Sequence, residues 1–345
     1  MKKEERRIDW IDLAKAIGII FVYIGHCNIP GVNLYVYMFH MPLFFVISGF
    51  CWNIQRNGSM DFKSFLKKKF DGYIVPYFKI CAICLMVIII PHNLKTLGLN
   101  DGFWDSLLKY LFGITIYSRG TVEWLPMCSP VWFLTCLFCA EILLYFIMKT
   151  KYNLILVVMS GVLGYIMSLF GKIFPWNIDS ALSAIPLLYV GIVMKKYWEH
   201  LSTPKYLLFL IPICIIILAF FPLRVDFDGN DYESFIRLYL ESVILVLTIL
   251  SLIRLLDIIL KRIKMAVNPI MKLWQTCGGG CPRGGGYLLG RNTLLLMGYN
   301  YAIIAVVGKM PISNLQHNFK QAFFTIVLGF LLVCIINICP SIKKF

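Results

Sequence analysis

Long apolar blocks, separated by short charged segments, constrain this chain more than any other feature. The blocks are near 20 residues long, which is the length of helix that crosses the hydrocarbon core of a bilayer. Of the 345 residues, 59% are hydrophobic and 15% are charged, whereas a soluble domain has about 25% charged residues. A backbone surrounded by lipid must satisfy its own hydrogen bonds. The sequence therefore predicts an all-α polytopic membrane protein.

About ten transmembrane helices are expected, and they fill the chain as a single integral membrane domain over 1–345. The expected spans are 10–28, 34–54, 73–91, 128–148, 153–171, 179–194, 206–222, 234–254, 286–307 and 321–340. A glycine-rich tract, CGGGCPRGGG, lies at 277–286. It lacks the Lys-Ser/Thr of a P-loop. We interpret it as a flexible cytoplasmic linker, with phosphate binding by its backbone N–H groups as the alternative.

The basic residues give the expected orientation. They flank the apolar blocks instead of forming one patch, so the net charge of +15 does not indicate a nucleic-acid partner. With the N-terminus in the cytoplasm, 22 lysines and arginines fall on the inner side and 8 on the outer side. This asymmetry follows the positive-inside rule and predicts that both termini are cytoplasmic. We expect a multi-pass protein of the cell (plasma or inner) membrane.

Two outer segments have an open interpretation. Residues 92–127 form the longest expected outer loop, and DFDGNDYE at 226–233 is acidic. Either could cover an outward-facing site or simply solvate helix ends. The cysteines and histidines do not have the spacing of a zinc site, so no metal is expected.

Ionisable residues inside apolar spans are costly and usually functional. The first span carries Lys15 and His26, eleven residues apart. That spacing is about three helical turns, so the two side chains project from nearly one face, about 16 Å apart along the axis. His40 lies in the second span, two residues before Pro42, where the helix is either kinked or only beginning. A histidine is a natural general base for a hydroxyl, because its pKa is about 6.5.

Several common catalytic patterns are absent from the sequence. None of the five histidines is followed five positions later by aspartate, as in His-x-x-x-x-Asp acyltransferases. There is no Gly-x-Ser-x-Gly elbow and no Walker A loop. The Ser48-Gly49 pair is more typical of close helix packing than of a nucleophile.

The N-terminal fifty residues resemble a known family. RRIDWIDLAKAIGIIFVYIGH at 6–26 and FHMPLFFVISGF at 39–50 are similar to the opening of the acyltransferase family 3 membrane proteins. The resemblance is closest to the fucose 4-O-acetyltransferase-like branch. It implies ten membrane helices and transfer of an acyl group, usually acetyl, from cytoplasmic acyl-CoA to a carbohydrate hydroxyl. The family motif of a basic residue, ten others and a histidine matches Lys15 and His26, which implies that His26 is catalytic.

Later segments resemble the family more loosely. SPVWFLTCLFCAEIL at 129–143 implies roles for Trp132 and Glu141, and GRNTLLLMGYN at 290–300 implies one for Asn292. KKKFDGYIVPYF at 67–78 resembles the family's approach to the third helix. This chain lacks the arginine that often stands near that proline, and Asn300 stands where a histidine is usual.

Residue positions and resemblance together predict a mechanism. The phosphates of acetyl-CoA would rest at the inner surface on a group of basic side chains, namely Lys15, Arg7, Lys68 and Lys69. His26 would deprotonate the acceptor hydroxyl, and His40 would catalyse with it or orient it. The expected substrate or supporting residues are Ser48, Trp132, Glu141 and Asn292.

Other functional classes stay open on the sequence alone. The chain could be a transporter or flippase of a small polar metabolite or amino acid, with Lys15, His26 and His40 lining a path. Membrane parts of some fused serine racemases look similar in the first segment. A non-catalytic partner in envelope assembly is a third option. Against transport, no internal two-fold repeat is visible in the sequence.

Overall fold

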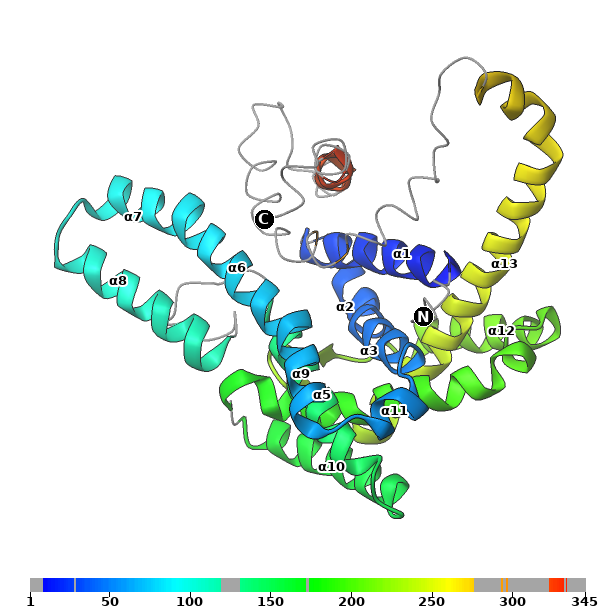
Figure 1. Ribbon diagram of the computed structural model, residues 1–345, viewed down its shortest axis with the longest axis horizontal. Coiled ribbons are helices and arrows are strands. Elements are labelled where there is room, and N and C mark those ends of the chain that lie inside the picture. Colours follow the sequence, from blue (N-terminus) through cyan, green and yellow to red (C-terminus); the bar gives the residue numbers. More distant parts are fainter. Residues whose placement is uncertain are drawn as a thin grey trace.

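The computed structural model describes residues 9–27, 29–118, 131–171, 174–275 and 323–331, together with Thr293, Leu296 and Val333. These residues are helical apart from turns and one short β-hairpin (Figure 1). Four helical segments are long and apolar enough to cross a membrane: Val32–Phe50, Phe62–Leu97, Pro175–Leu201 and Phe235–Arg262. Three shorter apolar helices cover Trp132–Ile147, Asn153–Leu169 and Lys205–Phe220. The all-helical class is confirmed, and the count of ten spans and their topology stay predictions.

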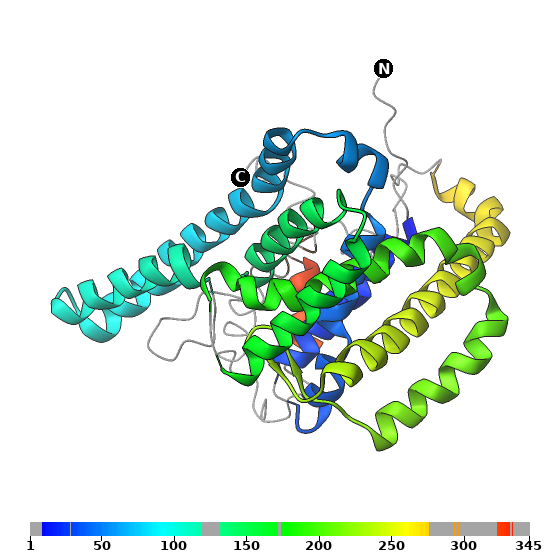
Figure 2. The same ribbon diagram turned by 90° about the horizontal axis from the view of Figure 1, so that it is seen from below.

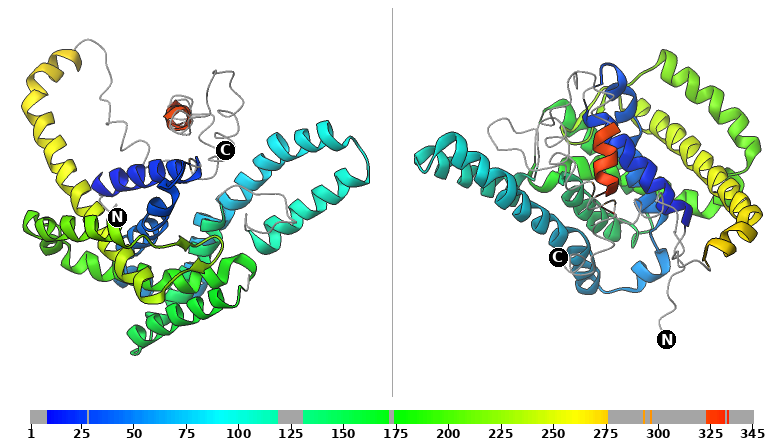
Figure 3. Two further views of the ribbon diagram at one scale, coloured as in Figure 1. Left: turned by 180° about the vertical axis from the view of Figure 1, so that it is seen from behind. Right: turned by 90° about the horizontal axis from the view of Figure 1, so that it is seen from above.

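The first helix, α1 (Asp9–His26), is continuous, so Lys15 and His26 share one helix as predicted. It carries three charged residues, Asp9, Asp12 and Lys15. It packs against α3 (His40–Phe50) and α13 (Phe235–Gln275), and helical residues 323–331 lie beside it (Figure 3). The Tyr23 hydroxyl donates to the Leu296 carbonyl at 2.9 Å. Protein therefore surrounds much of α1, which allows polar groups such as Asp12 to be buried.

The second apolar segment is two helices, α2 (Val32–Tyr37) and α3 (His40–Phe50). Phe39 caps α3 with a non-helical φ of −133°, so α3 begins at His40. Pro42 falls in the first turn of α3, where a backbone N–H has no intrahelical partner to lose. The expectation that a helix is only beginning at His40 is confirmed.

The centre of the fold is the contact between α3 and α11 (Ile178–Leu201). A Cβ added at Gly49 would overlap the Leu188 carbonyl, and one at Gly191 would overlap the Val46 carbonyl. Small residues let two membrane helices approach closely, so the predicted packing role of Gly49 is confirmed. On α11 pack α9 (Trp132–Ile147) and α10 (Asn153–Leu169), and α12 (Pro204–Phe220) packs along α13.

A helical arm projects from this body (Figures 1 and 2). One limb is Phe62–Leu97, which joins α5 (Phe62–Lys69), α6 (Val75–Cys84) and α7 (Ile90–Leu97) through the π-helical turns η1 (Phe70–Ile74) and η2 (Leu85–Ile89). The returning limb is α8 (Asp101–Phe112) and η3 (Gly113–Tyr117). The loop expected over 92–127 is therefore helical over most of its described part.

The span predicted from the sequence is 73–91, whereas the helical segment runs over Phe62–Leu97 and contains two prolines. Each π turn lies just before a proline: Val75 N–H donates to the Phe70 carbonyl ahead of Pro76, and Ile90 N–H donates to the Leu85 carbonyl ahead of Pro91. A proline in a regular α-helix clashes with the preceding turn. The wider π turn relieves that clash, so the helix continues.

The acidic segment after α12 folds into a hairpin of β1 (Val225–Asp226) and β2 (Asp231–Tyr232), with Val225 paired to Tyr232. Phe227 is buried against Phe45 of α3, with ring centroids 5.1 Å apart. The Ser180 hydroxyl donates to the Phe227 carbonyl at 2.6 Å. This segment therefore packs into the body of the molecule and does more than solvate the ends of helices.

Candidate functional site

Candidate residues gather in two places, and the first is a cavity of about 190 Å³ that we name the basic cavity. Its lining comes from α1, α3, α4 (Ile54–Ser59), α5, η1 and α9. Five residues predicted from the sequence line it: Lys15, Ser48, Lys68, Lys69 and Glu141. Arg56 adds a fourth cation, so four positive side chains face one carboxylate. The cavity is therefore suited to an anionic ligand.

Helix caps hold the basic segment in place. The Asn53 side chain accepts a hydrogen bond from Arg56 N–H at 2.9 Å and begins α4. The Asp61 carboxylate accepts one from Ser64 N–H at 3.0 Å and begins α5. Hydrogen bonds from the Ser64 side chain and backbone lower the pKa of Asp61. Such N-caps stabilise a helix by about 1 kcal/mol each.

The four cations do not have the same surroundings. Lys69 forms a salt bridge with Glu141, and the Tyr73 hydroxyl donates to the other Glu141 oxygen at 3.1 Å. The Lys69 ammonium also lies 5.3 to 5.6 Å from the ring centroids of Trp52, Phe65 and Tyr73. Its charge is thus balanced inside the protein, which makes it a support of the cavity wall.

Lys15 is more available to a ligand than Lys69. Lys15 has no ion-pair partner within the described residues. The Lys68 ammonium donates a hydrogen bond to the amide oxygen of Asn57 at 3.4 Å. Their charges therefore give the cavity its electropositive character.

The second place is a cluster of His26, Tyr37 and His40, which we name the histidine cluster. The Tyr37 ring is near both imidazoles, with its centroid 6.2 Å from that of His26 and 4.9 Å from that of His40. His40 Nδ1 lies 2.9 Å from the Val36 carbonyl. Because a carbonyl only accepts, Nδ1 carries the proton and Nε2 of neutral His40 is an acceptor. The two histidines are therefore neighbours, as a common chemical role would require.

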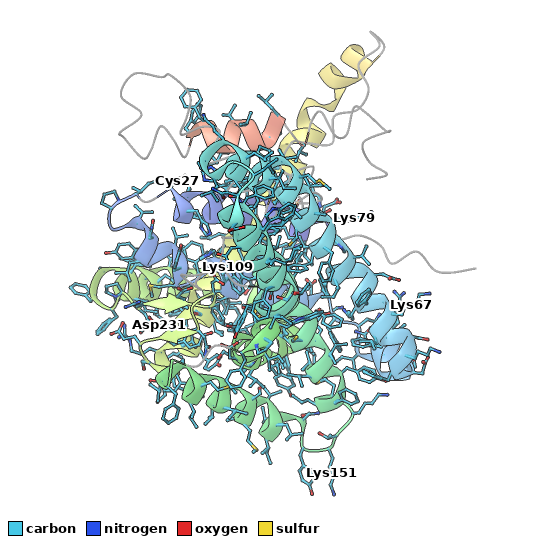
Figure 4. The ribbon with its side chains drawn as sticks, turned by 90° about the vertical axis from the view of Figure 1, so that its left-hand side faces the viewer. Cys27, Lys67, Lys79, Lys109, Lys151 and Asp231 are labelled. Carbon is cyan, nitrogen blue, oxygen red and sulfur yellow. The ribbon has the colours of Figure 1, made fainter. Side chains whose placement is uncertain are left out.

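The basic cavity lies beside Lys15 in the first half of α1, and the histidine cluster lies at its last residue, His26. Lys15 and His26 are eleven residues apart in this helix, which gives a rise of about 16 Å. Figure 4 shows Cys27, next to His26, toward one side of the molecule and Lys67, next to Lys68, toward the opposite side. Asp231 of the hairpin lies on the same side as Cys27. An extended ligand along α1 could reach from one place to the other.

A family comparison decides the chemistry. The model of the acyltransferase domain, Acyl_transf_3, matches residues 8–277. This chain belongs to the acyltransferase 3 family. It is an acyltransferase, and its apolar helices make it a multi-pass membrane protein. No curated protein and no solved structure matches the chain. Membership favours the acyltransferase prediction over the transporter alternative.

Other predicted residues of this acyltransferase lie elsewhere. Trp132 begins α9 and is buried, but it is not among the residues that line the basic cavity. Its carbonyl accepts hydrogen bonds from Thr135 at 2.8 Å and Asn177 at 3.4 Å. Asn177 follows Pro175 in η4 (Pro175–Asn177) and also donates to Ser118 at 2.7 Å. The Trp132 carbonyl is thus part of a buried polar network with Thr135, Asn177 and Ser118, which the sequence did not reveal.

Arg7, Asn292 and the glycine tract at 277–286 lie outside the described residues, as does nearly all of the span expected over 286–307. Among the residues that are described, no group of three or more His, Cys, Asp or Glu side chains could hold a metal ion. Sequence reasoning also missed Tyr37 and Arg56. The signal for Tyr37 was its position three residues before His40, since neighbours at this spacing share a face when the backbone is helical.

Proposed function

We propose that this acyltransferase moves an acetyl group from acetyl-CoA to a carbohydrate hydroxyl, with His26 as the general base. One observation carries the proposal: an electropositive cavity and a pair of histidines lie at the two ends of one helix. The phosphates of CoA are anionic and suit Lys15, Arg56 and Lys68. The pantetheine arm would extend along α1 and bring the thioester to His26. Arg7 is a further expected phosphate contact.

The reaction is acyl transfer from sulfur to oxygen. The acceptor oxygen attacks the thioester carbonyl while His26 removes the hydroxyl proton. The carbon–sulfur bond then breaks, and the proton on His26 passes to the CoA thiolate. The developing oxyanion needs a donor. Of the candidates that the sequence offers, Ser48 lines the basic cavity and neutral His40 presents an acceptor nitrogen, so Trp132 and Asn292 remain.

The positive-inside pattern supports a cytoplasmic donor site, since Lys68, Lys69 and Arg56 lie in a segment expected on the inner side. The histidine end would then lie toward the outer surface of the cell membrane. The resemblance to the fucose 4-O-acetyltransferase-like branch supports a glycan or a lipid-linked sugar as acceptor. The enzyme would thus modify envelope carbohydrate with cytoplasmic acetyl groups.

The test compares membranes that contain the wild type, His26→Ala or the control His92→Ala. His92 is exposed on α7, away from both sites. Incorporation of label from acetyl-CoA into glycan is measured, and mass spectrometry of surface glycans from a deletion strain identifies the acceptor. Loss of a general base lowers the rate by about 10²–10⁴-fold. Unchanged acylation with His26→Ala would refute the role of His26.

A further inference from the structure

Tyr37 is the residue that joins the two histidines, and neither the motif nor the spacing of the histidines points to it. Its ring centroid lies 6.2 Å from that of His26, at an interplanar angle of 49°, and 4.9 Å from that of His40, at 44°. His26 is the last residue of α1, and Tyr37 is the last residue of α2. The His26 imidazole also makes a hydrogen bond with the Val22 backbone, so its packing against Tyr37 acts together with that contact to set where the imidazole points.

Gly25 makes this packing possible. A Cβ at position 25 would lie 3.0 Å from Cε1 of Tyr37 and 3.2 Å from Cγ1 of Val36. The final turn of α2 therefore packs directly against the backbone of α1, one residue before His26. Any larger residue at position 25 would push the Tyr37 ring away.

The other side of Tyr37 is held by His40. The His40 ring is buried, and its Nδ1–H donates to the carbonyl of Val36, the residue before Tyr37. The imidazole of His40 is thus fixed by the same backbone turn that carries Tyr37. Held between this fixed ring and Gly25, the Tyr37 ring has a defined position next to His26.

An aromatic face at this position has a chemical consequence. During acyl transfer His26 gains a proton and becomes a cation. An aromatic ring attracts a cation located within about 6 Å of its centroid, and the His26 ring, whose centroid is 6.2 Å away at a tilt of 49°, lies at the edge of this range. Because the charge forms only in the transition state, this interaction affects kcat.

We propose that Tyr37 is a positioning residue of the acyltransferase: its ring orients the His26 imidazole and stabilises the imidazolium that forms during transfer. The inference rests on the proposed role of His26 as general base. It concerns the ring and not the hydroxyl. It therefore assigns different outcomes to a substitution that keeps the ring and to one that removes it.

The experiment measures kcat and the KM for acetyl-CoA in purified Tyr37→Phe, Tyr37→Leu and a control, Tyr35→Leu. Tyr35 is an exposed tyrosine two residues earlier on the same helix. We expect Tyr37→Leu to lower kcat about tenfold with an unchanged KM, because the basic cavity is at the other end of α1. Tyr37→Phe should retain wild-type kcat, and so should Tyr35→Leu.

Gly25→Ala tests the same ring from the opposite side, which keeps the inference falsifiable if Tyr37→Leu does not fold. We expect Gly25→Ala to lower kcat in the wild type but to have little further effect with Leu at position 37, because neighbours that act through one contact are not additive. A wild-type kcat for Tyr37→Leu, an equal loss for Tyr37→Phe, or a fully additive Gly25→Ala effect would overturn the inference. Activity that survives His26→Ala would instead overturn the proposed function.

Discussion

The two ends of α1 differ in the side chains that surround them: charged groups at one end and aromatic rings at the other. At one end, Lys15 faces a cavity with four cations and one carboxylate, and the wall contains a salt bridge and a cage of aromatic rings. At the other end, His26 lies in a cluster of aromatic rings with Tyr37 and His40. The first end can hold a charged ligand in place. The second can accept and return a proton.

This difference separates binding from chemistry along one rigid element. Because α1 is one continuous helix of 18 residues, the distance between the basic cavity and the histidine cluster is fixed. A ligand bound at the basic cavity therefore places its other end at a defined distance along α1. Substitutions at the cavity should therefore alter stability or the KM for the acyl donor. Substitutions in the histidine cluster should alter kcat. Each prediction below tests that separation.

Glu141→Ala is expected to have the largest effect among these tests. It would leave the ammonium of Lys69 without its carboxylate in a site where Lys69 is 13% and Glu141 3% exposed. Removing one partner of a buried ion pair costs about 3–5 kcal/mol. The midpoint of thermal unfolding of the purified protein should fall accordingly. Glu199→Ala, at an exposed position near the end of α11, is the control.

A double variant shows whether the loss comes from the unpaired charge. Replacing both partners with apolar residues, as Lys69→Met with Glu141→Leu, should recover most of the lost stability. If Glu141→Ala unfolds at the wild-type temperature, the salt bridge does not support the cavity wall. Lys69 would then be an available cation like Lys15.

Lys15→Gln is expected to raise the KM for acetyl-CoA about tenfold, because a hydrogen bond to a charged group contributes about 1.5–3 kcal/mol. The value of kcat should change little, since His26 is about 16 Å away along the helix. Steady-state kinetics with varied acetyl-CoA measures both constants. Lys95→Gln, on the exposed face of α7, should leave them unchanged. A lower kcat at constant KM would place Lys15 in the chemistry.

Much of this separation was predictable, because it follows from local periodicity. A basic residue and a histidine eleven positions apart in an apolar block must share a helix face. The basic run at 63–69 follows the second apolar block in the sequence, so its return to the Lys15 end was also expected. These relations depend on helical geometry and charge, which short stretches of sequence contain.

Contacts between distant segments were not predictable. Glu141 meets Lys69 across 72 positions of the chain, and no periodic pattern encodes that pairing. The resemblance implied a role for Glu141 without its partner. The helix that continues past Pro91 was also missed, because a proline normally ends a helix and the sequence does not show that η2 relieves the clash.

His40→Ala is expected to have a smaller effect on kcat than His26→Ala. It removes the hydrogen bond to Val36 and the ring that supports Tyr37, while His26 remains. A hydrogen bond of this kind contributes about 1 kcal/mol, which corresponds to a loss of about fivefold. Both variants are compared in the glycan-labelling assay. An equal loss in the two would make His40 a partner in catalysis, with no distinction between base and support.

Ionic strength should produce the smallest effect and should act on one end only. Salt screens the attraction between the cations of the basic cavity and an anionic ligand, with a Debye length of about 10 Å at 0.1 M. Between about 0.05 M and about 0.5 M salt, the KM for acetyl-CoA should rise about threefold, and this rise should be reduced in Lys15→Gln. The histidine cluster is built from contacts between rings, so kcat should change little. A kcat that falls with salt while KM stays constant would mean that charge matters at the histidine end, contrary to the division of roles along α1.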